Sequence, residues 1–69
     1  MIYYIEERKD GYAVIGRGND RSADIGLTKT QADNRAHELA GKDGYVGWKG
    51  INGKFKEWCP CKDCKRNLP

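Results

Sequence analysis

The first quarter of the chain carries the alternating pattern of a β-hairpin. Residues 2–8 and 12–16 are rich in β-forming side chains, and the Asp10-Gly11 turn signal lies between them. Residues 17–26 are polar and glycine-rich, so we expect them to form a loop. Because side chains alternate across a strand, one face of this hairpin is predicted to face the core: Tyr3, Ile5, Tyr12 and Val14.

An amphipathic helix is predicted to follow this loop. Thr28 is a favourable N-cap, and Gln31 three positions later matches the capping-box pattern. Small apolar side chains recur at helical spacing along one face: Ala32, Ala36, Leu39 and Ala40. Gly41 is placed to end the helix. Because this face is built of small side chains, the helix can lie close to a sheet.

The remaining apolar segments predict a second hairpin. Residues 44–50 and 54–58 flank Asn52-Gly53, the dipeptide that most strongly signals a type I′ turn. The predicted order is therefore ββαββ. The simplest fold class is α+β, a single antiparallel β-sheet with one helix packed on one face. We expect one domain over residues 1–58, followed by a Cys-rich basic C-terminal tail over residues 59–69.

One face of such a sheet stays uncovered, and the second turn assigns side chains to it. With Asn52-Gly53 as a two-residue loop, Lys49 pairs with Lys56, and Gly47 pairs with Trp58. Three apolar side chains are thereby assigned to the helix side: Val46, Trp48 and Phe55. The open face is predicted to combine apolar and aromatic side chains with lysines: Tyr4, Ile15, Tyr45, Lys49, Ile51, Lys54, Lys56 and Trp58.

Exposed aromatic area beside lysines is typical of an interaction site. Such a face suits single-stranded nucleic acid, because bases stack on rings while ammonium groups meet phosphates. A protein partner, self-association, and burial under the C-terminal tail are the alternatives. The net charge of +3 is unevenly divided. Residues 41–69 carry seven basic and three acidic side chains, against six and seven in residues 1–40, which favours an anionic partner.

The three cysteines, Cys59, Cys61 and Cys64, lie within six residues of one another. Thiolates at this spacing can ligate one metal ion, and Cys-x-x-Cys is a common zinc half-site. A structural zinc ion needs a fourth ligand, for which the candidates are Asp63, His37 and a cysteine of a second chain. His37 lies near the polar boundary of the helix, so we interpret it as a solvated side chain in preference to a ligand. A redox-active cysteine pair and a flexible tail with free thiols are the alternatives to zinc.

Several classes of protein do not fit this chain. Its 69 residues are too few for a dinucleotide-binding fold or a TIM barrel. No apolar run approaches the roughly 18–20 residues that span a membrane, and no secretory signal is recognised at the N-terminus.

The odd, clustered set of cysteines leads us to expect a cytoplasmic protein. The single histidine, at position 37, has no evident nucleophilic partner, and no glycine-rich phosphate loop follows a strand. We therefore predict a binding module and no enzyme.

Several segments resemble the bacterial family called domain of unknown function 2188. Gly11-Tyr12-Ala13-Val14 is similar to the Gly-Trp-x-Val signature of that family. The helix segment 28–40 and the closing hairpin 50–57, where basic residues flank the turn, are similar as well. The resemblance covers residues 3–58 and supports the fold, but it implies no activity. Tyr12 stands where Trp is usual, and the Cys-rich tail is extra, so a metal site would be particular to this protein and its close relatives.

Overall fold

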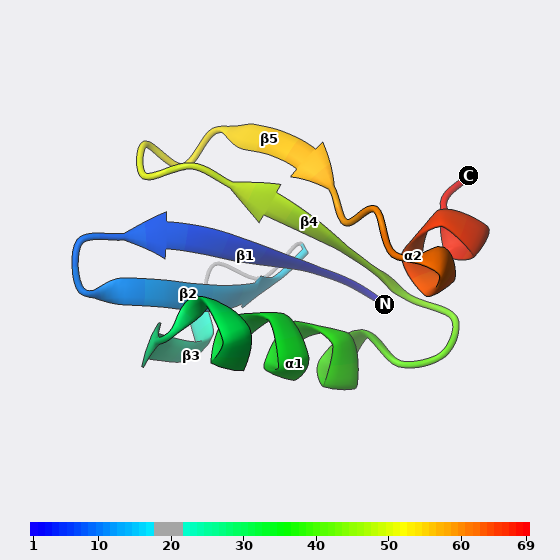
Figure 1. The fold of residues 1–69 in the computed structure, drawn as a ribbon, viewed down its shortest axis with the longest axis horizontal. Helices are drawn as coiled ribbons and strands as arrows, with labels where there is room; N and C mark the ends of the chain where they lie inside the picture. The colour runs from blue at the N-terminus through cyan, green and yellow to red at the C-terminus, as the bar shows by residue number, and fades with distance from the viewer. Residues whose placement is uncertain (18–21) are drawn as a thin grey trace.

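The computed structural model describes residues 1–17 and 22–69. Within these residues the strands and helices follow one another as β1 (Ile2–Arg8), β2 (Gly11–Gly16), β3 (Ser22–Leu27), α1 (Lys29–Ala40), β4 (Tyr45–Lys49), β5 (Phe55–Trp58) and α2 (Lys62–Asn67). The strands form one five-stranded sheet in the order β3-β2-β1-β4-β5 (Figure 1). No helix in the described residues is long and apolar enough to cross a membrane.

The prediction of a single antiparallel ββαββ sheet with one helix is wrong. The sheet is mixed, because β1 and β4 run parallel while the other neighbouring strands are antiparallel. Two elements were also missing from the prediction, namely β3 and α2. Residues 18–21 of the predicted loop 17–26 lie outside the described residues, but the following residues form β3.

The additional strand explains the parallel pair. A helical crossover carries the chain back to the end of the sheet at which the preceding strand began, so β4 runs parallel to the strand that precedes α1. Without β3, that preceding strand would be β2, and β4 would lie antiparallel to β1. With β3 inserted, the chain direction reverses once more, and β4 runs parallel to β1.

The first hairpin has the predicted faces, although its turn lies at Lys9-Asp10 and Gly11 already pairs with Arg8. Ile5 lies opposite Val14 and Tyr3 lies opposite Gly16, so the predicted core face is confirmed. Ile5 and Val14 are fully buried, whereas Tyr3 and Tyr12 pack against the core from its margin. The rest of the buried cluster is contributed by α1, β4 and the C-terminal segment: Ala32, Ala36, Ala40, Val46, Cys59 and Cys64.

The helix α1 begins and ends as predicted. Thr28 Oγ1 accepts a hydrogen bond from the backbone N–H of Gln31, and Gln31 Oε1 accepts one from the backbone N–H of Thr28. The capping box is therefore complete. The alanines of its apolar face are buried against the sheet, and Gly41 follows as the C-cap. This places His37 in the last turn of α1, at the end that faces the C-terminal segment.

The second hairpin differs from the prediction in its loop. The backbone N–H of Gly50 donates to the carbonyl oxygen of Lys54, so the loop that this hydrogen bond closes has three residues, 51–53, rather than two. Gly53 has a φ of 79°, the left-handed conformation that such three-residue loops require. Lys49 therefore pairs with Phe55, and the predicted Lys49–Lys56 pair is wrong.

A β-bulge then restores the predicted register at the far end of this hairpin. Trp48 lies opposite Glu57, so Lys56 is the additional residue of β5. Gly47 lies opposite Trp58, as predicted. The shift affects only the turn-proximal part of β5, but it carries the Phe55 side chain to the face opposite the one predicted.

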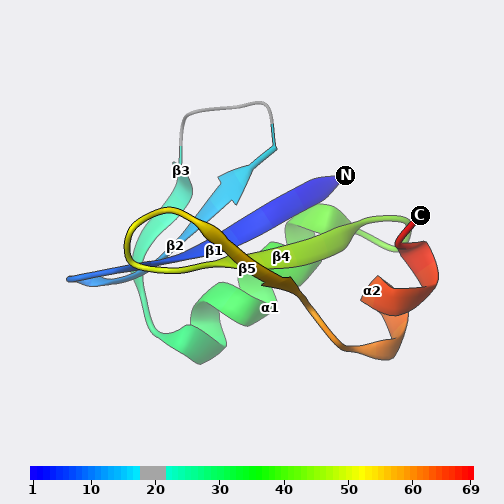
Figure 2. The same ribbon diagram turned by 90° about the horizontal axis from the view of Figure 1, so that it is seen from above.

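The C-terminal residues fold back onto the sheet rather than trailing away. Both views place α2 beside the beginning of β4 (Figures 1 and 2). The side-chain amide of Asn67 donates hydrogen bonds to the carbonyl oxygens of Lys42 and Gly44, at 2.7 and 2.8 Å. These bonds fasten α2 to the connection between α1 and β4. Since Cys64 packs in the same core as α1, the tail lies on the helix side and does not cover the open face.

Candidate metal centre

Four side chains with metal-binding atoms converge where α1, β5 and α2 meet. His37 comes from the last turn of α1, and Cys59 follows β5 directly. Cys61 is the N-cap of α2, and Cys64 lies inside that helix. Their ligand atoms all lie within 4.8 Å of one another, so these four residues could hold a metal ion.

The sulfur–nitrogen distances within this cluster match a tetrahedral site. The three sulfurs of Cys59, Cys61 and Cys64 lie 3.4, 3.6 and 3.4 Å from Nε2 of His37. In a tetrahedron with a Zn–S bond of about 2.3 Å and a Zn–N bond of about 2.0–2.1 Å, sulfur and nitrogen are separated by about 3.6 Å. The three sulfurs therefore lie at about the distance from Nε2 that a tetrahedral zinc ion requires.

The ring of His37 is oriented by its own helix. Its Nδ1 lies 2.7 Å from the carbonyl oxygen of Asp33 and 3.0 Å from Asp33 Oδ1. The shorter contact to the carbonyl makes the hydrogen bond, and Oδ1 lies beside it. When Nδ1 donates this bond, Nε2 keeps its lone pair and directs it at the sulfurs. Zinc-bound histidines are held by such partners in general.

Local backbone geometry explains how three cysteines so close in sequence share one centre. The backbone N–H of Cys59 donates to the carbonyl of Val46 at 2.8 Å, which extends the β4–β5 ladder by one residue. The chain then turns at Pro60, and Cys61 begins α2 with an extended backbone. Cys61 and Cys64 are three residues apart, so one helical turn brings both sulfurs to the same side.

The environment of the sulfurs favours one negative charge in the absence of a cation. Burial raises the pKa of the Cys64 thiol to about 12, and the hydrogen bond with Cys61 acts in the same direction. Burial also disfavours the Cys61 thiolate, but hydrogen bonds from the backbone and thiol of Cys64 outweigh it and lower the pKa of Cys61 to about 7. Burial raises the pKa of Cys59. A divalent cation would allow all three sulfurs to bind as thiolates.

The residue placed to act as the fourth ligand is His37 and not Asp63. His37 is half-buried against the three sulfurs, so its interpretation as a solvated side chain is wrong. Asp63 lies outside the cluster on an exposed part of α2, where it pairs with Arg66. Asp33 was not anticipated, although its position four residues before His37 on a helix is the spacing at which two side chains meet.

On the opposite face of the sheet, four rings form what we call the aromatic cluster: Tyr4, Tyr45, Phe55 and Trp58. Three of them were predicted to lie on the open face. The Trp58 ring lies 5.9 Å from Tyr4, 5.0 Å from Tyr45 and 4.7 Å from Phe55 between centroids. Phe55 is the member that the prediction placed on the helix side, and the residue is 46% exposed. The Lys49 ammonium group lies 4.5 Å from the centre of the Tyr4 ring.

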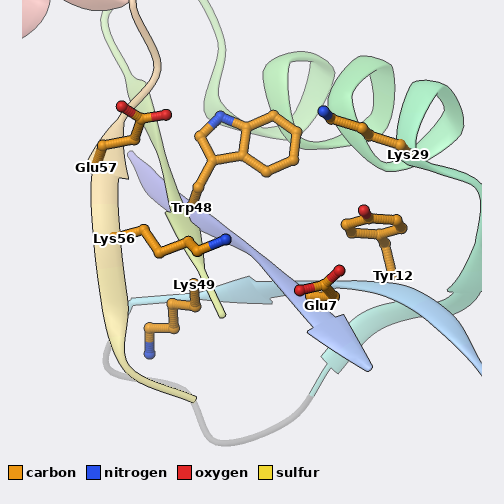
Figure 3. A pocket seen from close by; sticks show the side chains of 7 residues that line it. All are labelled: Glu7, Tyr12, Lys29, Trp48, Lys49, Lys56 and Glu57. Atoms are coloured by element: carbon orange, nitrogen blue, oxygen red, sulfur yellow. The ribbon is translucent and has the colours of Figure 1, made fainter. Parts of the chain in front are cut away.

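The other predicted members of the open face are dispersed. Lys56 and Lys49 both line a pocket of about 160 Å³, in which the Lys56 amine points toward Trp48 on the helix side and the Lys49 amine points away from it (Figure 3). Lys54 lies at the base of the loop, and Ile51 is 63% exposed within it. Ile15 lies opposite Tyr4 on β2. Lys49 is therefore the lysine that the fold brings to the rings.

Comparison with known proteins returns no match for this chain. No family model matches it, and neither a curated protein nor a solved structure is similar enough to be matched. The resemblance to domain of unknown function 2188 therefore stays a prediction. The function has to be inferred from the geometry of the two sites.

Proposed function

We propose that this protein is a zinc-stabilised binding module. A structural Zn²⁺ ion bound by His37, Cys59, Cys61 and Cys64 fastens the C-terminal segment to α1, while the open face of the sheet binds a partner. The observation that carries the proposal is the placement of three sulfurs at 3.4–3.6 Å around one imidazole nitrogen. Nδ1 of that imidazole is already engaged by Asp33, which leaves Nε2 for the metal.

The chemistry of the donor set favours zinc. Three thiolates and one imidazole form a Cys₃His site, one of the usual structural zinc sites. Thiolate ligands disfavour magnesium and calcium, which prefer oxygen. Four protein ligands close the coordination sphere and leave no position for a substrate. The proposed ion is therefore structural, and we propose a non-enzymatic role.

The small core supports a structural need for the metal. The largest fully buried side chains are Ile5, Val14, Val46 and Cys64, and the rest of the buried cluster is mainly alanine. A domain of this size buries little apolar area, and domains of this kind commonly depend on a metal or on disulfides. The three cysteines form no disulfide, so a bound metal ion is the cross-link that these residues could supply.

Metal content tests the proposal directly. Protein purified without chelator and analysed by native mass spectrometry is expected to carry one zinc ion per chain. Replacement by Co²⁺ is expected to give the absorption of tetrahedral thiolate coordination. Cys64→Ser and His37→Gln should each lose the ion under conditions in which Asp63→Asn keeps it, because Asp63 lies outside the cluster. A metal-free parent protein that takes up neither ion would refute the proposal.

A further inference from the structure

The aromatic cluster offers ring surface to solvent on the face that no helix covers. Phe55 is the most exposed of its rings, and Trp58 contacts each of the other three. Gly47 lies beneath them, where a Cβ atom would approach the rings of Phe55 and Tyr4 to 2.9 Å. The missing side chain at Gly47 therefore lets the rings pack closely over β4, with the Trp58 ring at an interplanar angle of 30° to Tyr4, 57° to Phe55 and 77° to Tyr45.

The free charge closest to the aromatic cluster is the positive charge of Lys49, which suits an anionic ligand. Residues 41–69 carry an excess of four positive charges and residues 1–40 a net charge of −1, but α2 and Lys56 place part of this excess on the helix side. Lys49 lies over the Tyr4 ring, and no carboxylate pairs with it among the described residues. On the open side of β1, β4 and β5 the one carboxylate is Glu6, and the Arg8 guanidinium pairs with it at 2.8 Å.

We infer that the open face binds single-stranded nucleic acid, with bases stacked on the aromatic cluster and phosphates held by Lys49. The inference rests on the proposed binding role of this face and names its ligand class. Each base has a flat surface that can stack on an exposed ring, and stacking of this kind needs no particular sequence. A face of aliphatic side chains with paired charges would instead suit a protein partner. On this face the aromatic rings make up the exposed apolar surface, and the nearest charge without a carboxylate partner is the positive charge of Lys49.

The two tryptophans give the binding test an internal control, because they lie on opposite sides of the sheet. In Trp48→Phe, the remaining tryptophan is Trp58 of the aromatic cluster. Titration with an unstructured oligothymidylate is expected to quench its fluorescence. In Trp58→Phe, the remaining reporter is Trp48, which lies on the helix side beside Lys29, and we expect little quenching. Circular dichroism establishes that each variant is folded.

A second measurement does not depend on either tryptophan variant. The anisotropy of a labelled oligothymidylate should report binding by the parent protein, and Phe55→Ala should weaken that binding about tenfold or more. Ile25→Ala is the matched control, because Ile25 is 65% exposed on β3, at the other edge of the sheet. Lys49→Gln should lower the slope of log affinity against log salt by about 0.7, the value for one phosphate contact to a single strand. Lys56→Gln makes the same charge change on the helix side and should alter the slope less.

Four outcomes would overturn the inference. The first is the absence of both Trp58 quenching and any anisotropy change, and the second is a Phe55→Ala variant that binds oligothymidylate as tightly as the parent protein. The third is inorganic polyphosphate, which has no bases, competing as well as unlabelled oligothymidylate does. The fourth is a dimeric parent protein that Phe55→Ala converts to a monomer. The last outcome would identify the face as a self-association surface. Metal content is measured on the same samples. Zinc without oligothymidylate binding refutes this inference alone, whereas oligothymidylate binding by a parent protein that takes up neither zinc nor cobalt refutes the zinc proposal alone.

Discussion

The Nε2 atom of His37 lies 3.4 Å from the sulfur of Cys64, although 27 residues separate them in the chain. The two atoms meet because α1 and α2 both pack at the end of the sheet where β4 begins. The contact is therefore a product of the tertiary fold and not of local sequence. If a metal ion occupies this position, binding it and holding α2 in place are one event.

The first prediction follows from that coupling. Adding zinc to the metal-free protein is expected to raise the melting temperature, because the ion binds the folded arrangement of ligands. At free zinc about a hundredfold above the dissociation constant, the stabilisation is about 2.7 kcal/mol. For a domain of this size, that corresponds to a rise of roughly 10–20 °C in a thermal unfolding experiment.

Excess chelator should reverse the effect, and a fresh addition of zinc should restore it. The Cys64→Ser variant supplies the control, because it lacks one ligand and should show the same melting temperature with and without zinc. The prediction would be contradicted if neither zinc nor chelator changed the melting temperature of the parent protein.

Local signals in the sequence were sufficient for the first hairpin and for α1. The Asp10-Gly11 signal marked the turn to within one residue, which keeps Ile5 and Val14 on the same face, and the Thr28–Gln31 capping box marked the start of the helix. These features depend on residues close together in the chain. The strand β3 has no comparable signal, because its residues include Asp24 and Gly26 and become a strand through pairing with β2. Missing it also reversed the predicted direction of β4 relative to β1.

Only the part of the candidate site that depends on residues close together in the chain could be predicted from the sequence. The spacing of Cys59, Cys61 and Cys64 indicated a metal site directly. The fourth ligand could not be chosen from the sequence, because His37 is brought to the sulfurs by the packing of α1 against the sheet. Phe55 was assigned to the wrong face because the Asn52-Gly53 signal does not distinguish a two-residue loop from a three-residue loop.

The second prediction concerns the side chain of Asp33. Its Oδ1 lies 3.0 Å from Nδ1 of His37, but the stronger hydrogen bond goes to the Asp33 carbonyl and survives any substitution at this position. Loss of a group that orients a metal-bound histidine typically lowers metal affinity by about 10–100-fold. We expect Asp33→Ala to lower zinc affinity by about tenfold, because the hydrogen bond to the Asp33 carbonyl remains. Competition against a chelator of known affinity measures the change.

Asn34→Ala is the neighbouring control, because Asn34 is exposed on the same helix and is expected to leave zinc affinity unchanged. Equal affinities for Asp33→Ala and the parent protein would mean that the backbone carbonyl alone orients the imidazole.

The third prediction tests the start of α1. Thr28→Ala removes the Oγ1 atom that accepts from the backbone N–H of Gln31 at 3.1 Å. Loss of such an N-cap costs about 1 kcal/mol, which corresponds to a fall in melting temperature of about 4–8 °C. Zinc content should stay at one ion per chain, because His37 lies in the last turn of the same helix. Thr30→Ala, an exposed change within the first turn, should be neutral or slightly stabilising; a matching loss there would rule out the cap as the cause.

The fourth prediction concerns the space beneath the aromatic cluster. In Gly47→Ala, the new Cβ atom would lie 2.9 Å from ring atoms of Phe55 and Tyr4 and 3.0 Å from the ring of Trp58. These distances are shorter than van der Waals contact, so the rings must move. Overpacking of this kind costs about 1–3 kcal/mol, which corresponds to a fall in melting temperature of roughly 5–20 °C. The emission of Trp58 in the Trp48→Phe background should shift as well, because its contacts change.

Gly16→Ala separates this steric effect from the general effect of placing alanine in a strand. Gly16 also lies in a strand beside an aromatic ring, but its added Cβ atom would lie 3.4 Å from the ring of Tyr3, which is ordinary contact. The substitution reduces the freedom of the unfolded chain and should leave the melting temperature unchanged or slightly higher. If both variants lose stability equally, alanine in the strand is the cause. If only Gly47→Ala loses stability and shifts the Trp58 emission, the rings of the open face are packed over Gly47, as the proposed nucleic-acid surface requires.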